Sequence, residues 1–315
     1  MDHKYPADSE VLDSTLRARL GTSLEFRKEL APLTTFKTGG TARYYLAARQ
    51  IDDMVRAVKA ANEFNLPIFL IGGGSNLLVS DSGFDGIIVK MDIRGLRLIG
   101  ETGIEAGAGE DLMALVNYAA EYSLSGLEFA SGIWGTVGGA IFGNAGAYGG
   151  EIGKLIREVT LVDQKGEIKS VDREYCQFGY RDSYFKKTGE MIIKAQLDLK
   201  PGNAVDIRSK IKEILAVRNT KFPPHGKSAG CFFKNVPDSN EKYGKLPAGR
   251  LLEEAGAGDI SVGGACVYEK HANLIINSNA ATSKDIRELA DKLKEKVFDK
   301  FGIRLEEEVT QVGEF

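Results

Sequence analysis

The stretch Pro67-Ile68-Phe69-Leu70-Ile71-Gly72-Gly73-Gly74-Ser75-Asn76-Leu77-Leu78 decides the fold class of this chain. Its apolar run predicts a short strand, and the three glycines that follow predict that the strand ends in a turn. The preceding segment, residues 51–64, carries apolar residues at helical spacing, with Asp52 and Asp53 suited to the first turn of a helix. A helix, a strand and a glycine-rich turn in this order predict an α/β or α+β protein.

The same patterns predict further elements along the chain. A hairpin joins residues 159–162 to 168–171 through a turn at 164–167, and Pro201-Gly202-Asn203 forms the clearest linker. Residues 1–30 are expected to form a leading helical or irregular arm. The remaining predicted elements are strands at 86–91, 191–199 and 303–312 and helices at 112–123, 205–218 and 283–301, the last capped by Thr282 or Ser283.

Length and composition limit the possible classes of protein. A chain of 315 residues predicts two or three domains. The net charge of -3 gives no global field for nucleic acid, and no apolar run approaches the roughly 20 residues of a membrane span. The 3 widely spaced cysteines indicate reduced thiols, residues 1–10 show no apolar signal core, and the 3 histidines lack metal-ligand spacing. We therefore expect a cytoplasmic protein that binds neither metal, nucleic acid nor membrane.

Two glycine-rich segments are candidate cofactor sites. In residues 72–78 the backbone N–H groups can converge on an anion such as a diphosphate, while a tight turn after a strand is the alternative. This motif is neither a P-loop nor a dinucleotide-binding fingerprint. In residues 132–149 the many small residues permit close approach to a flat, bulky ligand. Apolar residues threaded through this second segment indicate burial rather than a flexible loop.

Charged residues elsewhere have both a functional and a structural interpretation. Arg181 can bind a carboxylate through two hydrogen bonds, or form a surface salt bridge with Asp182 or Glu190. A basic cluster around residues 218–234 fits substrate phosphates or a solvated basic face. On a strand, the first and third glutamates of residues 306–308 share one face, so a carboxylate can enter a cleft, or all three can line an exposed acidic edge.

One thiol stands out because of its neighbours. Cys231 follows a glycine-containing turn, at the start of a predicted strand in residues 228–235. An unperturbed thiol, with a pKa of about 8.5, is mostly protonated near neutral pH, so it can donate a proton. A lowered pKa would make it a nucleophile instead. We predict a largely protonated Cys231, although Lys227 or Lys234 could lower its pKa.

Taken together, these segments resemble the UDP-N-acetylenolpyruvoylglucosamine reductase (MurB) family. Eight segments occur in the family's order over nearly all of residues 30–313. The length resembles that of the shorter, type II-like subclass, which lacks an inserted loop with a substrate-capping tyrosine. Tyr148, Tyr180 and Tyr184 are candidates for closing the site instead. The matching segments are 33–40, 72–78, 126–149, 180–185, 221–235, 247–253, 269–273 and 305–309.

The resemblance implies the FAD-binding α+β fold of the vanillyl-alcohol-oxidase (PCMH) type, with two FAD-binding subdomains and a substrate-binding α+β domain. We also expect a monomer. The implied divisions are an N-terminal arm at 1–30, FAD-binding subdomains at 31–85 and 86–202, a substrate-binding domain at 203–303, and a C-terminal strand returning to the active site at 304–315.

The resemblance also implies a reaction. NADPH would reduce non-covalently bound FAD, and a hydride from flavin N5 would reach the β-carbon of UDP-N-acetylglucosamine enolpyruvate. A proton on the α-carbon would complete UDP-N-acetylmuramate, a peptidoglycan precursor needed for the cell wall, cell shape and division. Such an enzyme is a UDP-N-acetylmuramate dehydrogenase, a flavoprotein oxidoreductase. FAD would contact Gly72, Gly73, Gly74, Ser75, Asn76, Leu77, Gly135, Thr136, Gly138, Gly139, Asn144, Ala145, Gly146 and Ala147.

Three residues match the family's catalytic positions. Arg181 would hold the substrate carboxylate, and Glu308 would help to bind its developing enol form. Cys231 would donate the proton, where the best-known members carry a serine. The residues implied to bind the remainder of the substrate are Tyr180, Arg218, Lys221, Lys234 and Asn235.

Three other functions remain as alternatives. A flavin oxidase of the same fold often attaches its flavin to a histidine, but no histidine lies near residues 72–78. A flavin- or nucleotide-binding module without catalysis would not need Arg181, Cys231 and Glu308 together. A transferase with Cys231 as nucleophile would not need two glycine-rich cofactor segments.

Overall fold

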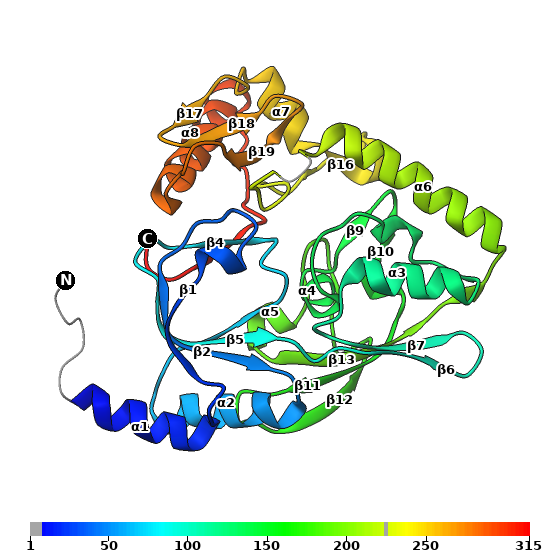
Figure 1. Cartoon of the computed structure of the whole chain (residues 1–315). Coiled ribbons are helices and arrows are strands. Elements are labelled where there is room, and N and C mark those ends of the chain that lie inside the picture. The colour runs from blue at the N-terminus through cyan, green and yellow to red at the C-terminus, as the bar shows by residue number, and fades with distance from the viewer. Residues whose placement is uncertain (1–7, 224–225) are drawn as a thin grey trace.

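The computed structural model describes residues 8–223 and 226–315 of the chain. Figure 1 shows a lower body built on two sheets and an upper layer formed by the C-terminal third, with helix α6 (Ala204–Lys221) running between them. The first seven residues of the expected arm, His3 and His225 lie outside the described residues. Within the described part of the chain, no helix combines the length and the apolar character needed to cross a bilayer.

The first sheet contains four strands in the order β1-β2-β5-β3. Its last three strands are parallel, and β1 pairs antiparallel with β2. Helix α2 (Ile51–Glu63) makes the crossover from β2 to β3, and its N-terminus is held by a capping box between Gln50 and Asp53. Helix α1 (Asp8–Leu20) packs beside α2. The strands are β1 (Glu25–Glu29), β2 (Thr41–Ala48), β3 (Ile68–Ile71) and β5 (Phe84–Met91).

The second sheet is antiparallel, with five strands in the order β12-β11-β13-β7-β6. The predicted hairpin is confirmed as β11 and β12. Helix α4 (Val137–Phe142) packs on β13 and β7, and α3 (Leu112–Glu121) packs on α4 and α6. One apolar core runs through both sheets. The strands are β6 (Leu96–Ile99), β7 (Gly103–Gly107), β11 (Ile156–Val162), β12 (Ile168–Asp172) and β13 (Met191–Asp198).

The upper layer has its own sheet and its own core. Strands β17 (Ser261–Val262), β18 (Ala265–Tyr268) and β19 (His271–Asn277) form an antiparallel sheet, which contacts helices α7 (Ala248–Glu254) and α8 (Ser283–Phe301). Thr282 caps α8, as predicted. Phe36 and Leu78, from the first third of the chain, belong to this core, so the layer is packed onto the lower body.

The predicted strand at 303–312 is wrong over most of its length. Only β20 (Thr310–Val312) forms, and it pairs in parallel with β4 (Leu77–Val79). Upstream, Glu307 forms a single bridge with Phe233. The segment therefore contacts the upper layer first and the lower body afterwards, as the red trace in Figure 1 shows. Because its partner changes, no single strand pairs with the whole of residues 303–312.

Smaller differences concern element boundaries. Strand β1 lies within the expected arm, and β5 starts before residue 85, so the first sheet includes residues on both sides of the divisions placed at 30/31 and 85/86. Helix α6 continues to Lys221, beyond the predicted end at 218. The remaining short elements are η1 (Ala31–Leu33), β8 (Leu124–Ser125), η2 (Glu128–Ala130), β9 (Gly146–Ala147), β10 (Gly150–Glu151), η3 (Ile152–Lys154), α5 (Phe185–Thr188), β14 (Lys200–Pro201), β15 (Val236–Pro237), η4 (Lys242–Gly244) and β16 (Lys245–Leu246).

Candidate active site

The first glycine-rich loop follows β3 and touches the second glycine-rich segment. A Cβ on Gly73 would lie 2.7 Å from Cα of Gly135, and one on Gly72 would lie 2.5 Å from Oγ1 of Thr136. Both distances are below any normal contact, so the two backbones can meet only without side chains. Lys90 Nζ donates a hydrogen bond to the carbonyl of Gly72 and fixes the loop on the sheet.

The second segment turns at its glycines and then enters α4. Thr136 caps this helix by accepting a hydrogen bond from Gly139 N at 3.3 Å. A Cβ on Gly138 would lie 2.8 Å from that of Ala108, so the helix packs closely on the chain after β7. Further along, Gly146 and Ala147 form β9 and pair with β10. The expected cofactor residues of both segments therefore lie in one continuous region of backbone.

Unlike the other expected cofactor residues of this segment, Asn144 uses its side chain to bond the protein backbone. Its side chain is buried, and its Nδ2 donates a hydrogen bond of 2.8 Å to the carbonyl of Gly179. Its Oδ1 accepts one of 3.0 Å from Gly153 N. The amide thus ties the second glycine-rich segment to the turn that carries Arg181.

These glycine-rich segments fit a flavin dinucleotide. Gly72, Gly73 and Gly135 form a cradle that side chains would fill, and cradles of backbone N–H groups suit a diphosphate. The hydroxyl of Ser131, directly before the second segment, is buried without a hydrogen-bond partner among the described residues. Such a donor is available to a polar ligand.

Arg181 sits at the tip of a tight turn. Gly179 and Asp182 exchange backbone hydrogen bonds around it, and its φ of 54° places it in the left-handed region that side chains rarely adopt. Its Nε lies 2.7 Å from Oε1 of Glu308, within ion-pair distance. Nε is buried and makes no hydrogen bond to any residue of the described part of the chain, so its contact with Glu308 is an ion pair. The guanidinium therefore has a donor to spare for an anionic ligand.

Glu308 and its neighbours reach different partners. Glu308 N donates to the carbonyl of Phe232, which places the carboxyl beside the Cys231 segment. Glu307 instead bonds Lys294 on α8, and Glu306 pairs with Lys234. Burial raises the pKa of Glu308 above its usual range, while the charges of Arg181 and Lys186 oppose the rise. A raised pKa favours a carboxyl group that can hold a proton.

Cys231 lies in an extended segment between β19 and residues 306–308. It forms an isolated bridge with Leu274 rather than part of a regular strand. The side chain of Asn273 makes two hydrogen bonds with the backbone of Phe233, 2.9 and 2.8 Å long, and so fixes the segment. Burial raises the pKa of the thiol to about 11, Glu308 adds to the rise, and Arg181 and Arg218 oppose it. The protonated thiol of our prediction agrees with this value.

The structure also identifies which cations oppose the rise in the Cys231 pKa. The sequence suggested Lys227 or Lys234 for this role, whereas Arg181 and Arg218 are the groups found. Lys234 is paired with Glu306. Arg218 Nε donates to the carbonyl of Gly132 at 3.0 Å, and its guanidinium lies over the Phe222 ring. It therefore links α6 to the second glycine-rich segment.

Tyr180 and Asn235 connect the Arg181 turn to the upper layer. Asn235 N donates to Tyr180 Oη at 3.2 Å, and its Oδ1 accepts from Ala248 N at 3.1 Å. Lys245 Nζ lies 4.3 Å from the centre of the Tyr180 ring. Lys221 is exposed at the end of α6. Tyr180 and Asn235 are thus in direct contact beside the Arg181 turn, whereas no contact between them and Lys221 is found among the described residues.

Three lysines at the site were missed from the sequence. Lys90 holds the glycine loop, Lys186 donates to the carbonyl of Arg181, and Lys245 lies over Tyr180. Lys90 is the one charged residue in the apolar run of residues 86–91, and this was the only sequence feature that could have indicated its role. Nothing local distinguishes the other two from surface lysines.

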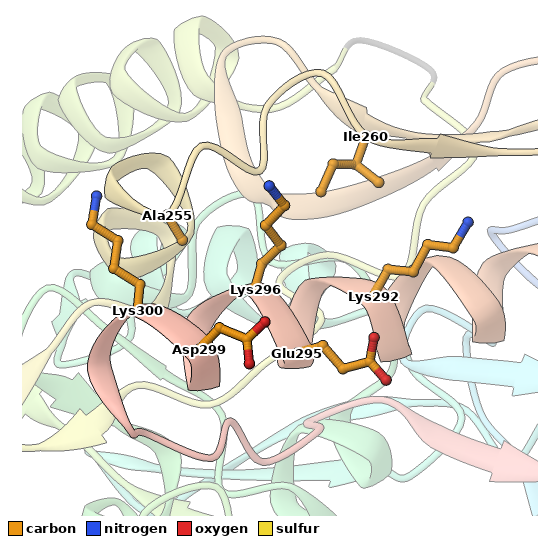
Figure 2. A pocket seen from close by; sticks show the side chains of 7 residues that line it. All are labelled: Ala255, Ile260, Lys292, Glu295, Lys296, Asp299 and Lys300. Atoms are coloured by element: carbon orange, nitrogen blue, oxygen red, sulfur yellow. The ribbon is translucent and has the colours of Figure 1, made fainter.

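A separate depression in the upper layer is lined by none of these residues. It has a volume of about 640 Å³ and is lined by residues of α8 and the chain after α7, among them Lys292, Lys296 and Lys300 (Figure 2). It is open and shallow, and holds none of the expected catalytic residues. No group of three or more His, Cys, Asp or Glu suited to a metal occurs in residues 8–223 and 226–315.

The comparisons with known proteins cover both parts of the chain. Residues 42–172 match the family model described as an FAD binding domain. Residues 222–312 match the model described as UDP-N-acetylenolpyruvoylglucosamine reductase, C-terminal domain.

Relatives match the chain along almost its whole length. A UDP-N-acetylenolpyruvoylglucosamine reductase of Lachnoclostridium phytofermentans is 40% identical, covering 90% of this chain and 91% of its own. One of Streptococcus thermophilus is 36% identical, covering 96% and 98%. The crystal structure of the Thermus caldophilus MurB superposes with a TM-score of 0.76 at 31% identity, over 92% of this chain and 98% of that one. The chain therefore belongs to the UDP-N-acetylenolpyruvoylglucosamine reductase family.

Proposed function

We propose that this protein is an FAD-dependent oxidoreductase that reduces UDP-N-acetylglucosamine enolpyruvate to UDP-N-acetylmuramate, with NADPH as the reductant. One observation supports this most strongly. Arg181, Cys231 and Glu308 come from three separate segments, yet Arg181 and Glu308 form an ion pair and both act electrostatically on the Cys231 thiol. A guanidinium, a carboxyl and an acid placed together suit the reduction of an unsaturated carboxylate.

Residues of the two glycine-rich segments would hold FAD, with Gly72 to Leu77 at its diphosphate and Gly135 to Ala147 against its ring system. Bound FAD would supply the hydride, having received it from NADPH. Ser131 offers one further donor. Asn144 would contribute by fixing the backbone of the second segment, because its side-chain amide is already engaged with protein groups.

Arg181 would bind the carboxylate of the substrate. Hydride addition to the β-carbon leaves negative charge that spreads into that carboxylate, and a fixed guanidinium stabilises such charge best where water is excluded. Its Nε has no hydrogen-bond acceptor among residues 8–223 and 226–315, so the guanidinium can donate to a ligand oxygen. Glu308, whose pKa burial raises, would share a proton with the enol form of the same group.

Cys231 would protonate the α-carbon. Its pKa of about 11 keeps the thiol protonated at neutral pH, which is the state that a proton donor needs. The same protonation disfavours the alternative of a nucleophilic thiolate. A transferase that uses Cys231 as a nucleophile is therefore a weaker interpretation of this site.

Cationic and amide side chains would hold the uridine diphosphate of the substrate. We assign this role to Lys221, Arg218, Lys234 and Asn235, with Tyr180 beside Asn235 and Lys245 as an addition. The substrate-binding part is residues 203–303 by this assignment, and the protein acts as a cytoplasmic monomer on a small molecule.

The experiment uses the purified, FAD-loaded protein. We expect anaerobic NADPH to bleach the flavin absorbance, and the enolpyruvyl sugar nucleotide to restore it with formation of UDP-N-acetylmuramate. Little recovery should occur in air. Rapid recovery in air without the sugar nucleotide would indicate an oxidase, and a flavin that NADPH cannot bleach would reject the proposed reductant. In the variant Arg181→Lys, the flavin should bleach normally but recover slowly. Lysine lacks the planar guanidinium group that can donate two parallel hydrogen bonds to a carboxylate.

A further inference from the structure

One lysine at the site is outside every role assigned so far. Lys186 lies on the short helix α5, and its Nζ donates a hydrogen bond of 2.6 Å to the carbonyl of Arg181. The helix follows the Arg181 turn directly, because Lys186 N also bonds the carbonyl of Ser183. Lys186 thus contacts the backbone of the residue whose side chain meets Glu308.

The turn needs such contacts, because Arg181 has a φ of 54°. A side chain other than glycine is strained in this region, and the strain persists only where the surroundings enforce it. Three hydrogen bonds do so here. Asn144 holds Gly179, Ser183 Oγ donates to the carbonyl of Phe142 at 2.7 Å, and Lys186 holds Arg181 itself.

The charge of Lys186 also reaches the carboxyl group. Lys186 is exposed as a whole residue, yet burial of its ammonium group lowers the pKa of Lys186. The positive charge of Lys234 lowers this pKa further. Lys186 opposes the rise in the pKa of Glu308, second only to Arg181 among the charges that do so. The titratable groups that act on Glu308 are Arg181 and Tyr180 from the turn, Lys186 from α5, Lys234 from the neighbouring extended segment, and the Cys231 thiol.

We propose that Lys186 is a positioning residue, whose ammonium group holds the Arg181 turn in its left-handed conformation and keeps the guanidinium against Glu308. This inference rests on the proposed function for its kinetic consequence, but its structural part does not. Without the ammonium group the turn would relax toward an unstrained φ and carry the guanidinium away from the carboxyl group. Reduction of the substrate would then slow, while reduction of the flavin by NADPH would not depend on Lys186.

The test compares Lys186→Gln with Lys186→Arg and with Lys187→Gln, a control at the adjacent exposed lysine. We expect Lys186→Gln to slow flavin reoxidation by the enolpyruvyl sugar nucleotide about 10- to 100-fold, with bleaching by NADPH and FAD content unchanged. Lys186→Arg should restore most of the rate. In Lys186→Gln, the limb of the pH–rate profile that reports the ionisation of Glu308 should move to higher pH by about half a unit or more. The reason is the loss of a positive charge that keeps the pKa of Glu308 from rising further.

Two results would overturn the proposal. One is a Lys186→Gln rate equal to that of the Lys187→Gln control. The other is a slow Lys186→Gln enzyme whose pH profile is unchanged and whose loss follows a lower melting temperature. A crystal structure of Lys186→Gln gives a readout without catalysis: an Arg181 still at positive φ and still paired with Glu308 also rejects it. If the wild-type protein itself fails to use the sugar nucleotide, the proposed function fails, and the crystal structure still decides the role of Lys186.

Discussion

The hydroxyl of Ser75 donates a hydrogen bond of 2.8 Å to the carbonyl of Trp134. The first glycine-rich loop is therefore bonded to the second by a side chain, beside the contact between Gly73 and Gly135. The two segments form one surface although the helix α3 and two strands of another sheet lie between them in the sequence. A ligand bound to one glycine-rich segment therefore lies next to the other segment as well.

Gly73→Ala should weaken FAD binding by at least about tenfold, because the added Cβ meets backbone rather than a movable side chain. Trp134 is the only tryptophan of the chain and borders the cradle, so quenching of its fluorescence measures FAD binding without any turnover. Gly258→Ala is the matched control, since nothing lies within 4 Å of its Cβ position. Equal FAD affinity in the two variants would show that the cradle does not contact the cofactor.

Cys231→Ala should reduce recovery of the flavin by the enolpyruvyl sugar nucleotide about 10²- to 10⁴-fold, the usual contribution of a positioned general acid. Bleaching by NADPH should stay at the wild-type rate, because that step needs no proton from Cys231. Stopped-flow absorbance separates the two steps. Cys266→Ala, at a thiol in β18 away from Arg181, is the control. Recovery at the wild-type rate in Cys231→Ala would show that Cys231 is not the proton donor.

The raised pKa of Cys231 predicts a pH-dependent contribution to stability. The thiol titrates near 9.0 in the unfolded chain and near 11 in the folded one, so the folded state holds the proton more tightly. This contribution, on the order of 2 kcal/mol, is complete below pH 9 and disappears as the pH rises through 11. The hydroxyl of Cys231→Ser does not titrate there. The difference in unfolding free energy between wild type and Cys231→Ser should therefore shift against the wild type between pH 9 and 11, and a constant difference would contradict the buried thiol.

Asn144→Ala should lower the free energy of unfolding by about 1–3 kcal/mol, because it removes the partners of the buried Gly153 N–H and the partly buried Gly179 carbonyl. It should also slow substrate reduction, since the Arg181 turn loses one of its supports. Chemical denaturation and single-turnover kinetics measure the two effects. Asn240→Ala, in an exposed loop, is a suitable control. An Asn144→Ala protein as stable as this control would show that the bond to Gly179 is unimportant.

The sequence indicated elements best where the apolar pattern was strong. The helices at 51–64 and 283–301 form as predicted, since each buries one regular apolar face. The hairpin at 159–171 also forms, although its second strand is mostly exposed and is held by its pairing with β11. Strand β1 was missed because Glu25–Glu29 has a single apolar residue and joins the sheet by backbone pairing. The strand expected at 303–312 failed because its partner changes midway, which no local pattern encodes.

For the candidate site, the motifs indicated which residues meet but not how they are held. Arg181, Cys231 and Glu308 were each proposed from the resemblance, and the fold brings them together. The left-handed turn at Arg181 was not foreseen, because arginine rarely adopts that conformation. Lys186 and Lys90 act on backbone carbonyls, so their roles depend on tertiary structure alone.

The parallel pairing of β20 with β4 has a consequence for biosynthesis. Residues 77–79 leave the ribosome long before residues 310–312 exist, so β4 stays unpaired along one edge until the later segment has been made. The carboxylate of Glu308 arrives with that later segment. A nascent chain should thus form the contact between Arg181 and Glu308, and complete the pairing beside the first glycine-rich loop, only after residues 308–312 have left the ribosome.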